Sequence, residues 1–221
     1  MGKLRAVAGS KARVDDNVRR LGRPPATDSI ETRRKILETA RREFAVHGYE
    51  VTTNRRIAAE VGITPAALYH YFPSKLDLYV AVRDYTEDAV ATRFRDVTAT
   101  AGTLADRLSI VLEESHRMNS EDPSLAQFLG AFRIDQRRHP ELATTIADHP
   151  QPLADFIVGM VDDAVSNGEV DRSDRQTILS SITILLVGLS DAMSDDLRAH
   201  RRGIDASRVL LAGGLPVRRR S

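Results

Sequence analysis

Apolar positions recur at helical spacing along almost the whole of this 221-residue chain. The first clear example spans residues 29–47, where one apolar face is formed by Ile36, Leu37, Ala40 and Phe44. Alternation typical of a β-strand never continues for more than a few residues. The pattern therefore predicts an all-α protein.

Two short helices joined by a glycine turn follow this first helix. Thr53 is placed to cap the earlier helix, because a hydroxyl can accept a hydrogen bond from a first-turn N–H. Gly62 ends it, since glycine tolerates the left-handed conformation. Thr64 caps the later helix and Pro65 takes its first position, where a missing N–H is no loss. This arrangement predicts a helix-turn-helix.

The later helix has the two faces that a DNA-reading helix needs. Leu68 and Phe72 lie four residues apart and are expected to point into the core. The opposite side carries small and polar residues, namely Ala66, Ala67, Tyr69, His70 and Tyr71. A helix that begins with small residues can enter a major groove, where its first residues reach base edges. Helix–glycine–helix pairs also occur in helical proteins that bind no DNA, so this motif alone leaves both interpretations open.

The flanking residues and the charge distribution favour DNA. Phe72-Pro73 ends the reading helix, Ser74 caps the next one, and Lys75 stands beside exposed N–H groups that suit a phosphate. Residues 1–80 hold 15 basic and 9 acidic side chains, whereas residues 81–221 hold 17 and 22. A basic N-terminal part and an acidic remainder fit a protein that binds nucleic acid at one end, although this charge imbalance alone is weak support.

The run from Ile36 to Leu78 closely resembles the DNA-binding domain of the tetracycline-repressor (TetR) family. The positions that carry the resemblance include Gly48, Tyr49, Thr52, Gly62, Thr64, Tyr69, Tyr71, Phe72, Ser74 and Lys75. The resemblance covers about fifty residues and implies a homodimeric repressor that leaves a palindromic operator when a small molecule binds. Pro65-Ala66 departs from the commoner pair of a basic residue and glycine, which leaves the operator sequence open.

The resemblance also implies roles for particular side chains. Thr52, Tyr69 and Lys75 are similar to phosphate contacts, and Arg55 with residues 65–67 is similar to the base-reading positions. Together with the residues taken from the helix-turn-helix itself, the expected DNA-binding set is Thr52, Thr53, Arg55, Arg56, Thr64, Pro65, Ala66, Ala67, Tyr69, His70, Tyr71, Lys75 and Arg23.

A basic arm, residues 1–28, precedes the helix-turn-helix domain, which we place at residues 29–75. The arm lacks apolar periodicity and is expected to be disordered in the free protein. Arg23 follows Gly22 and precedes Pro24, and an arginine on a narrow extended segment suits the potential of a narrow minor groove. The alternative is a solvated tail that adds only non-specific affinity.

Residues 76–215 read as a helical ligand-binding and dimerisation domain, followed by a basic tail at 216–221. From Lys75 onward, the expected helices are 75–98, 103–119, 122–138, 141–147, 151–167, 173–199 and 205–213. Their predicted breaks fall at glycine, proline and capping residues, including an interruption at Gly203.

The stretch from Ile178 to Leu189 is the most apolar in the chain, and at twelve residues it is too short to cross a bilayer. We expect it to face both its own domain and a second copy, and the family resemblance supports a dimer. The expected interface residues are Ile182, Leu185, Leu186, Leu189, Met193 and Leu210. A central core helix in a monomer is the alternative.

The middle helices are expected to enclose a small-molecule pocket, although most apolar residues there belong simply to the core. Phe94, Leu112, His116, Asn119, Phe128 and Phe132 are the candidate lining residues.

Composition limits the other possibilities. The chain has no cysteine, which excludes disulfides and thiolate chemistry, and its six histidines show no metal-binding spacing. We find no nucleotide-binding or nucleophile motif, and we therefore expect no enzyme, no catalytic residue, no metal and no cofactor.

The absence of an apolar leader predicts a cytoplasmic protein that associates with the nucleoid when bound to DNA. Its expected partners are double-stranded operator DNA, a small-molecule effector and a second copy, but no membrane. Two rival functions stay open. One is a helical ligand-binding protein or enzyme with the helix-turn-helix as scaffold, and the other is a non-specific architectural DNA binder.

Overall fold

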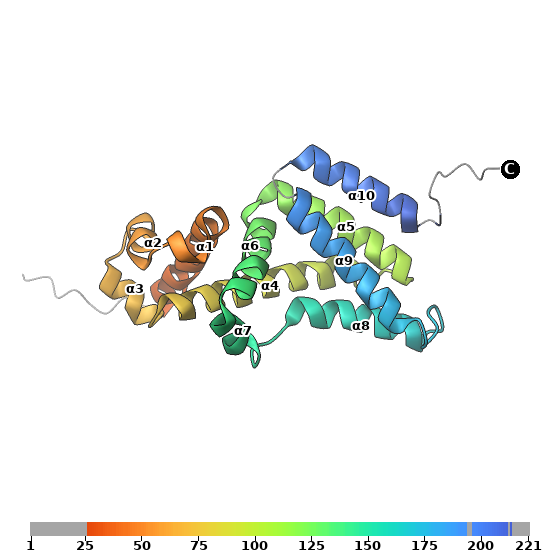
Figure 1. Ribbon diagram of the computed structural model, residues 1–221, viewed down its shortest axis with the longest axis horizontal. Helices are drawn as coiled ribbons and strands as arrows, with labels where there is room; N and C mark the ends of the chain where they lie inside the picture. Colours follow the sequence, from red (N-terminus) through yellow and green to blue (C-terminus); the bar gives the residue numbers. More distant parts are fainter. Residues whose placement is uncertain (1–25, 194–195, 212, 214–221) are drawn as a thin grey trace, which may run out of the picture.

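The computed structural model describes residues 26–193, 196–211 and 213, and within them it contains ten α-helices and no strand. The predicted all-α class is confirmed. Figure 1 shows α1, α2 and α3 gathered at one end of the molecule, which we call the head. The helices α5, α8, α9 and α10 form the body at the other end, and the long helix α4 runs from one to the other.

The head consists of α1 (Ala26–Val51), α2 (Asn54–Val61) and α3 (Pro65–Tyr71). Local sequence signals form its turns as expected. The Thr53 side chain accepts a hydrogen bond from the Arg56 amide, and the Thr64 side chain accepts one from the Ala67 amide. Gly48, with φ 72°, breaks the helical path of α1, and Gly62, with φ 80°, ends α2. Glycine is needed at both positions because other residues are strained at positive φ.

Lys75, the first residue of α4, holds the turn between α1 and α2. Its ammonium group donates hydrogen bonds to the carbonyls of Tyr49 (2.7 Å), Glu50 (3.2 Å) and Thr52 (3.2 Å). The same nitrogen lies 4.4 Å from the centre of the Tyr49 ring, in the geometry of a cation–π contact. Lys75 therefore ties the start of α4, four residues after α3, to the end of α1.

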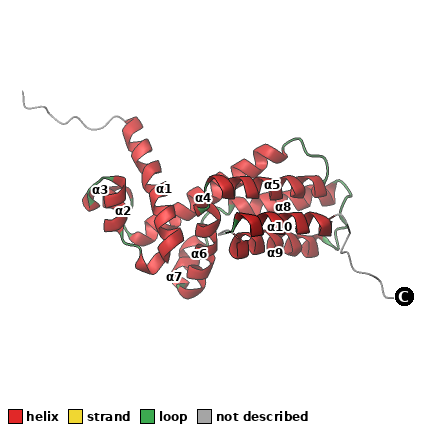
Figure 2. Ribbon diagram, turned by 90° about the horizontal axis from the view of Figure 1, so that it is seen from above, coloured by secondary structure: helices red, strands yellow, loops and turns green. Residues whose placement is uncertain are grey.

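The remaining helices follow the predicted order, with most boundaries within two residues of expectation. They are α4 (Lys75–Thr98), α5 (Leu104–Glu121), α6 (Ser124–Arg138), α7 (Pro140–Ile146), α8 (Pro152–Ser166), α9 (Arg175–Met193) and α10 (Leu197–Leu211). Figure 2 shows α5, α8, α9 and α10 packed along one another in the body.

The last two helices differ from the sequence prediction. The helix expected at 173–199 ends at Met193, and α10 begins at Leu197 instead of residue 205. Asp196 provides the start that the prediction missed, because its carboxylate accepts hydrogen bonds from the amides of Arg198 (2.8 Å) and Ala199 (3.1 Å). Gly203 lies inside α10 and does not interrupt it.

The hydrophobic core of the head continues into α4, α6 and α7. Phe44 of α1 and Tyr79 of α4 pack against Phe128 of α6, with ring centroids 4.6–6.5 Å apart. Leu142 and Ile146 of α7 belong to the same buried cluster. The domain boundary expected between residues 75 and 76 therefore falls in the first turn of α4, and apolar packing continues across it.

A histidine pair joins α5 to α10 in the body. The Nδ1 atoms of His116 and His200 lie 3.1 Å apart, and the two rings are stacked. His200 is buried, with 2% of its surface exposed. Burial and the neighbouring His116 lower the pKa of His200 below its ordinary value of 6.5. The folded protein therefore favours the neutral form of His200.

None of the described helices combines the length and the apolar composition needed to span a bilayer.

Replacing Lys75 by methionine is expected to lower the melting temperature, because three carbonyls lose a charged donor. Hydrogen bonds to charged groups contribute about 1.5–3 kcal/mol, and we expect a loss in that range. Thermal unfolding followed by circular dichroism measures it. The matched control is Lys35→Met, since Lys35 donates to a single carbonyl, that of Val61, at 3.1 Å. Equal losses in the two variants would show that the three-carbonyl clamp adds no stability.

The His200 pair predicts a pH dependence of stability. Because the pKa of His200 is lower in the folded protein than in the unfolded chain, the contribution of neutral His200 to stability is complete above pH 6.5. Below that pH, the unfolded chain takes up the proton first. The contribution of His200 therefore falls as the pH drops toward the pKa of the folded state. Between pH 7 and pH 5, the melting temperature should decrease more for the native protein than for His200→Asn. Parallel pH profiles would contradict the expectation.

Candidate nucleic-acid interface and internal cavity

The reading helix α3 is anchored on one side and bare on the other. Leu68 is fully buried and Phe72 is 3% exposed, so both point into the core as predicted. Pro65, Ala66 and His70 are exposed, and Tyr69 shows 50% of its surface. The exposed side begins with small residues and leads to two polar rings, which suits insertion into a major groove.

Other predicted DNA-binding residues surround this helix on the same head. Thr53 and Thr64 are exposed capping residues, and Arg55 is exposed at the start of α2. Arg56 is half-exposed and forms an ion pair with Glu43 at 2.5 Å, which orients it along the side of α1. Ala67, at the start of α3, is partly exposed. These residues can be proposed as contacts because their side chains reach the surface.

The structure contradicts the predicted contact at Thr52, whereas Lys75 and Tyr71 are partly buried and stay predictions. Thr52 is fully buried and its hydroxyl donates to the Glu43 carbonyl at 3.3 Å, so it faces the protein interior. Lys75 donates its hydrogen bonds to the three backbone carbonyls at the end of α1 described above. Tyr71 is partly buried against the core of the head. Their spacing in the sequence did not reveal that folding itself uses these groups. Arg23 lies outside the described residues.

A cavity of about 130 Å³ lies between the middle helices and the body. Its apolar walls include Val90 and Phe94 of α4, Leu125 and Leu129 of α6, Leu153 and Ile157 of α8, and Leu186 and Leu189 of α9. Polar groups on the walls come from Ser115, Asn119, Arg133, Thr183, Ser190 and His200. The guanidinium of Arg133 donates to the hydroxyl of Ser190 at 3.1 Å, which makes one corner of the cavity polar.

Two of the six predicted pocket residues, Phe94 and Asn119, line this cavity. Phe128 and Phe132 do not, because they point from the other face of α6 into the core shared with the head. Leu112 is buried in the core of the body, and His116 borders a shallower hollow on the outside of α5. The sequence showed that these residues are apolar or polar at helical spacing, but not which face of each helix meets the cavity.

Two of the predicted dimer residues, Ile182 and Leu189, need correction. Ile182 and Leu189 are buried within the body, and Leu185 and Leu186 are partly buried against the same cluster. The side chain of Met193 lies outside the described part of the chain. Of the predicted set, Leu210 is exposed, at 52%. The bare face of α9 instead carries Ser180, Ile184 and Gly188, and α10 exposes Leu197, Val209, Leu210 and Leu211.

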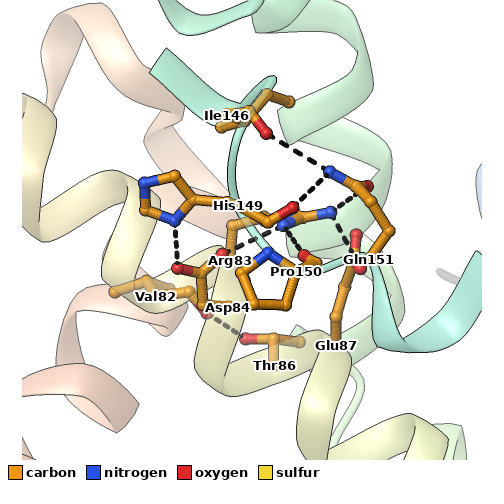
Figure 3. A network of polar contacts seen from close by, with 9 residues as sticks. All are labelled: Val82, Arg83, Asp84, Thr86, Glu87, Ile146, His149, Pro150 and Gln151. Atoms are coloured by element: carbon orange, nitrogen blue, oxygen red, sulfur yellow. Dashed lines mark hydrogen bonds and ion pairs between the residues drawn. The ribbon is translucent and has the colours of Figure 1, made fainter.

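A polar network at Arg83 joins α4 to the link between α7 and α8 (Figure 3). Arg83 is 2% exposed, and its guanidinium donates to the Pro150 carbonyl (2.7 Å), to Glu87 (2.9 Å) and to the side chain of Gln151. Burial raises the pKa of Glu87 above its ordinary value, and this effect outweighs the opposing effect of the Arg83 charge. Glu87 of this network lies about one helical turn before Val90 of the cavity wall, so the network fixes α4 close to the cavity.

A second set of polar contacts between helices lies at Asp135 of α6. One carboxylate oxygen of Asp135 accepts hydrogen bonds from the Tyr49 amide (3.0 Å) and from the Tyr79 hydroxyl (2.8 Å). Burial, and then the hydrogen bond to Asp135, raise the pKa of Tyr79 well above its ordinary value. Tyr79 therefore acts as a hydrogen-bond donor that ties α4 to α6.

Comparison with known proteins agrees with this geometry. The sequence model described as "Bacterial regulatory proteins, tetR family" matches residues 36–82, which contain most of α1, all of α2 and α3, and the start of α4. The regulator UidR of Escherichia coli K12 is 22% identical over 189 residues, which is 85% of this chain and 94% of UidR. The repressor AcnR of Corynebacterium efficiens is 32% identical over 132 residues, which is 58% of this chain and 63% of AcnR.

Solved structures share the fold over most of the chain. Salmonella enterica GusR superposes with a TM-score of 0.69 at 24% identity and covers 85% of this chain and 97% of its own. A structure of AibR gives a TM-score of 0.64 at 21% identity, over 81% of this chain and 97% of AibR. The shared fold thus extends from the reading head through the helices that enclose the cavity, and within it residues 36–82 match the model of the bacterial regulatory proteins of the tetR family.

Proposed function

We propose that this protein is a repressor that binds an inverted-repeat operator as a homodimer and leaves it when a small molecule occupies the cavity. The observation that carries the proposal is the exposed face of α3. Leu68 and Phe72 anchor the opposite side of this helix in the core. Such a helix presents Pro65, Ala66 and Tyr69 in one fixed orientation, and a fixed orientation is what base reading requires.

The dimer supplies the second reading head. The bare face of α9 has small side chains at Ser180 and Gly188 on either side of Ile184, which is 72% exposed. Small residues let a second helix approach closely, and an exposed isoleucine gains free energy when it is buried. The exposed leucines and valine of α10 extend this surface, which fits a two-fold interface between copies.

The cavity supplies the effector site. Its volume of about 130 Å³ is below the typical range of about 300–1,000 Å³ for ligand pockets. An engineered apolar cavity of about 150 Å³ binds benzene, so the space suits a compact, mainly apolar molecule with one hydrogen-bonding end. Structures of the same fold include AibR in complex with isovaleryl coenzyme A and operator DNA, and FadR of Bacillus subtilis in complex with stearoyl-CoA.

Release follows if the effector favours a head-to-head spacing that the operator does not fit. The effector must bind that state more tightly than the DNA-bound state, because equal affinity for both would shift nothing. The cavity is lined by residues of α4 and α6, and both helices also pack against α1 of the head. An effector that prefers one of two arrangements of these helices would therefore change the position of the head.

Selection from a random duplex library tests DNA recognition directly. The native protein is expected to enrich an inverted repeat whose half-sites lie about 34–36 Å apart, one turn of the double helix. Tyr69→Ala should weaken binding to the enriched duplex by roughly 10- to 150-fold, the equivalent of about 1.5–3 kcal/mol for a lost hydrogen bond to a phosphate. Fluorescence anisotropy at fixed salt measures the affinity.

The control for this experiment is Val158→Ala, which shortens an exposed side chain on α8 of the body. It should bind the duplex like the native protein. Failure to enrich any sequence over competitor DNA would favour a non-specific binder. The absence of any DNA binding would favour a head that serves only as scaffold.

Charge placed on the bare face of α9 tests the dimer. Ile184→Arg is expected to give a monomer in sedimentation velocity, because two buried guanidinium groups would face each other without partners. Val158→Arg places the same charge on an exposed apolar position of α8 and should leave the dimer intact. A dimeric Ile184→Arg variant would place the interface elsewhere.

A further inference from the structure

Helix α6 separates the cavity from the head and contributes to both. The residues Leu125, Ala126, Leu129 and Arg133 line the cavity. Its other face carries Phe128 and Phe132, which pack into the core that α1 and α4 share with it. A displacement of α6 that enlarges or reduces the cavity must therefore also act on α1, because packed interiors transmit strain.

The first turn of α6 is fastened to the middle of α1. Arg41, buried at 6% exposure, donates to the hydroxyl of Ser124 at 3.0 Å and forms an ion pair with Asp122 at 2.5 Å. Burial acts to raise the pKa of Asp122, but the hydrogen bonds from Ser124 and Arg41 outweigh it and lower the pKa. This contact fixes the beginning of α6 relative to α1.

The last turns of α6 are fastened to the turn that leads into the helix-turn-helix. Asp135 is 6% exposed, and a single oxygen of its carboxylate accepts from both the Tyr49 amide and the Tyr79 hydroxyl. Tyr49 directly follows Gly48, whose φ of 72° forms the turn. The carboxylate of Asp135 is thus the point where α6, α4 and the end of α1 meet.

The Tyr49 backbone continues the connection to the reading helix. Its N–H donates to Asp135 of α6, and its carbonyl accepts from Lys75, which lies four residues after the end of α3. The cavity wall is therefore linked to the head through α6 itself, then through the hydrogen bonds from Tyr49 to Asp135 and from Lys75 to Tyr49, and residues 72–74 of the chain join Lys75 to the reading helix.

We propose that Asp135 is a positioning residue that passes the state of the cavity to the reading head through α6. This inference rests on the proposed function, because it concerns how that cavity controls DNA binding. Asp135 contacts neither the effector nor the DNA. It sets where the Gly48–Tyr49 turn stands relative to the cavity wall, and hence the orientation of α3.

A substitution that fills the cavity replaces the unidentified effector in the test. Ala126→Leu adds bulk to the cavity face of α6, and Ala154→Leu makes the same change at an exposed position of α8. The readout is the distance between spin labels on Glu60→Cys in the head and Ser166→Cys in the body, both at exposed sites. The chain has no cysteine of its own, so the labels attach only at these two positions.

Ala126→Leu is expected to shift the label distance by about 1–2 Å, the usual size of a helix displacement, and Ala154→Leu should leave it unchanged. Combined with Asp135→Ala, the shift should disappear. Asp135→Asn should restore it, because an amide oxygen can accept both hydrogen bonds. Thermal unfolding confirms that each variant is folded.

Operator affinity gives a second readout with the duplex enriched in the selection experiment. Ala126→Leu should weaken binding by a factor between about 5 and 150, the usual range of allosteric coupling. In the Asp135→Ala background, the same change should alter affinity by less than about twofold.

The inference is overturned if Ala126→Leu shifts neither distance nor affinity, a result that needs no Asp135 variant. It is also overturned if the effects of Ala126→Leu and Asp135→Ala simply add, which would indicate a purely structural aspartate. Failure of the proposed function is a separate result: the label distance would respond as expected while no duplex is enriched.

Discussion

The structure depends on one continuous apolar core that passes from the reading head into the body. Tyr79 of α4 lies at its centre, between Phe44 of α1 and the phenylalanines of α6, and its hydroxyl is satisfied by Asp135. A domain as small as the head buries a small fraction of its surface, so apolar contacts with its neighbours matter for its stability. Because the core of the head is continuous with that of α6 and α7, packing and not a free linker sets the position of the head relative to the body.

The same dependence explains which features could be predicted from the sequence. Helix starts at Thr53, Thr64 and Ser74 and the stop at Gly62 are local, since each involves a side chain or a backbone angle within four residues. They were therefore predicted correctly. The start of α10 was missed because Asp196 was not recognised as a cap. Gly203 was predicted to interrupt the helix, but a helix interior can tolerate a single glycine.

Roles that depend on distant contacts could not be predicted in this way. Lys75 and Thr52 have the sequence positions of phosphate contacts, yet their partners are backbone carbonyls 9 to 26 residues away in the chain. Phe128 and Leu129 are neighbours with similar chemistry, and only the packing of α6 places one in the core and the other at the cavity. For α9, hydrophobicity indicated burial, but the most apolar side of the helix faces its own domain, and the bare side is poorer in large residues.

The brevity of α3 has a consequence for the energetics of recognition. Seven residues are too few to hold a helix in water without help, because helices of that length are marginal even with favourable sequences. Here the threonine cap, the initial proline and two buried anchors keep it formed before any duplex arrives. Ordering entropy is thus spent during folding, and the encounter with a half-site can proceed as the docking of a rigid body, with little affinity lost to disorder.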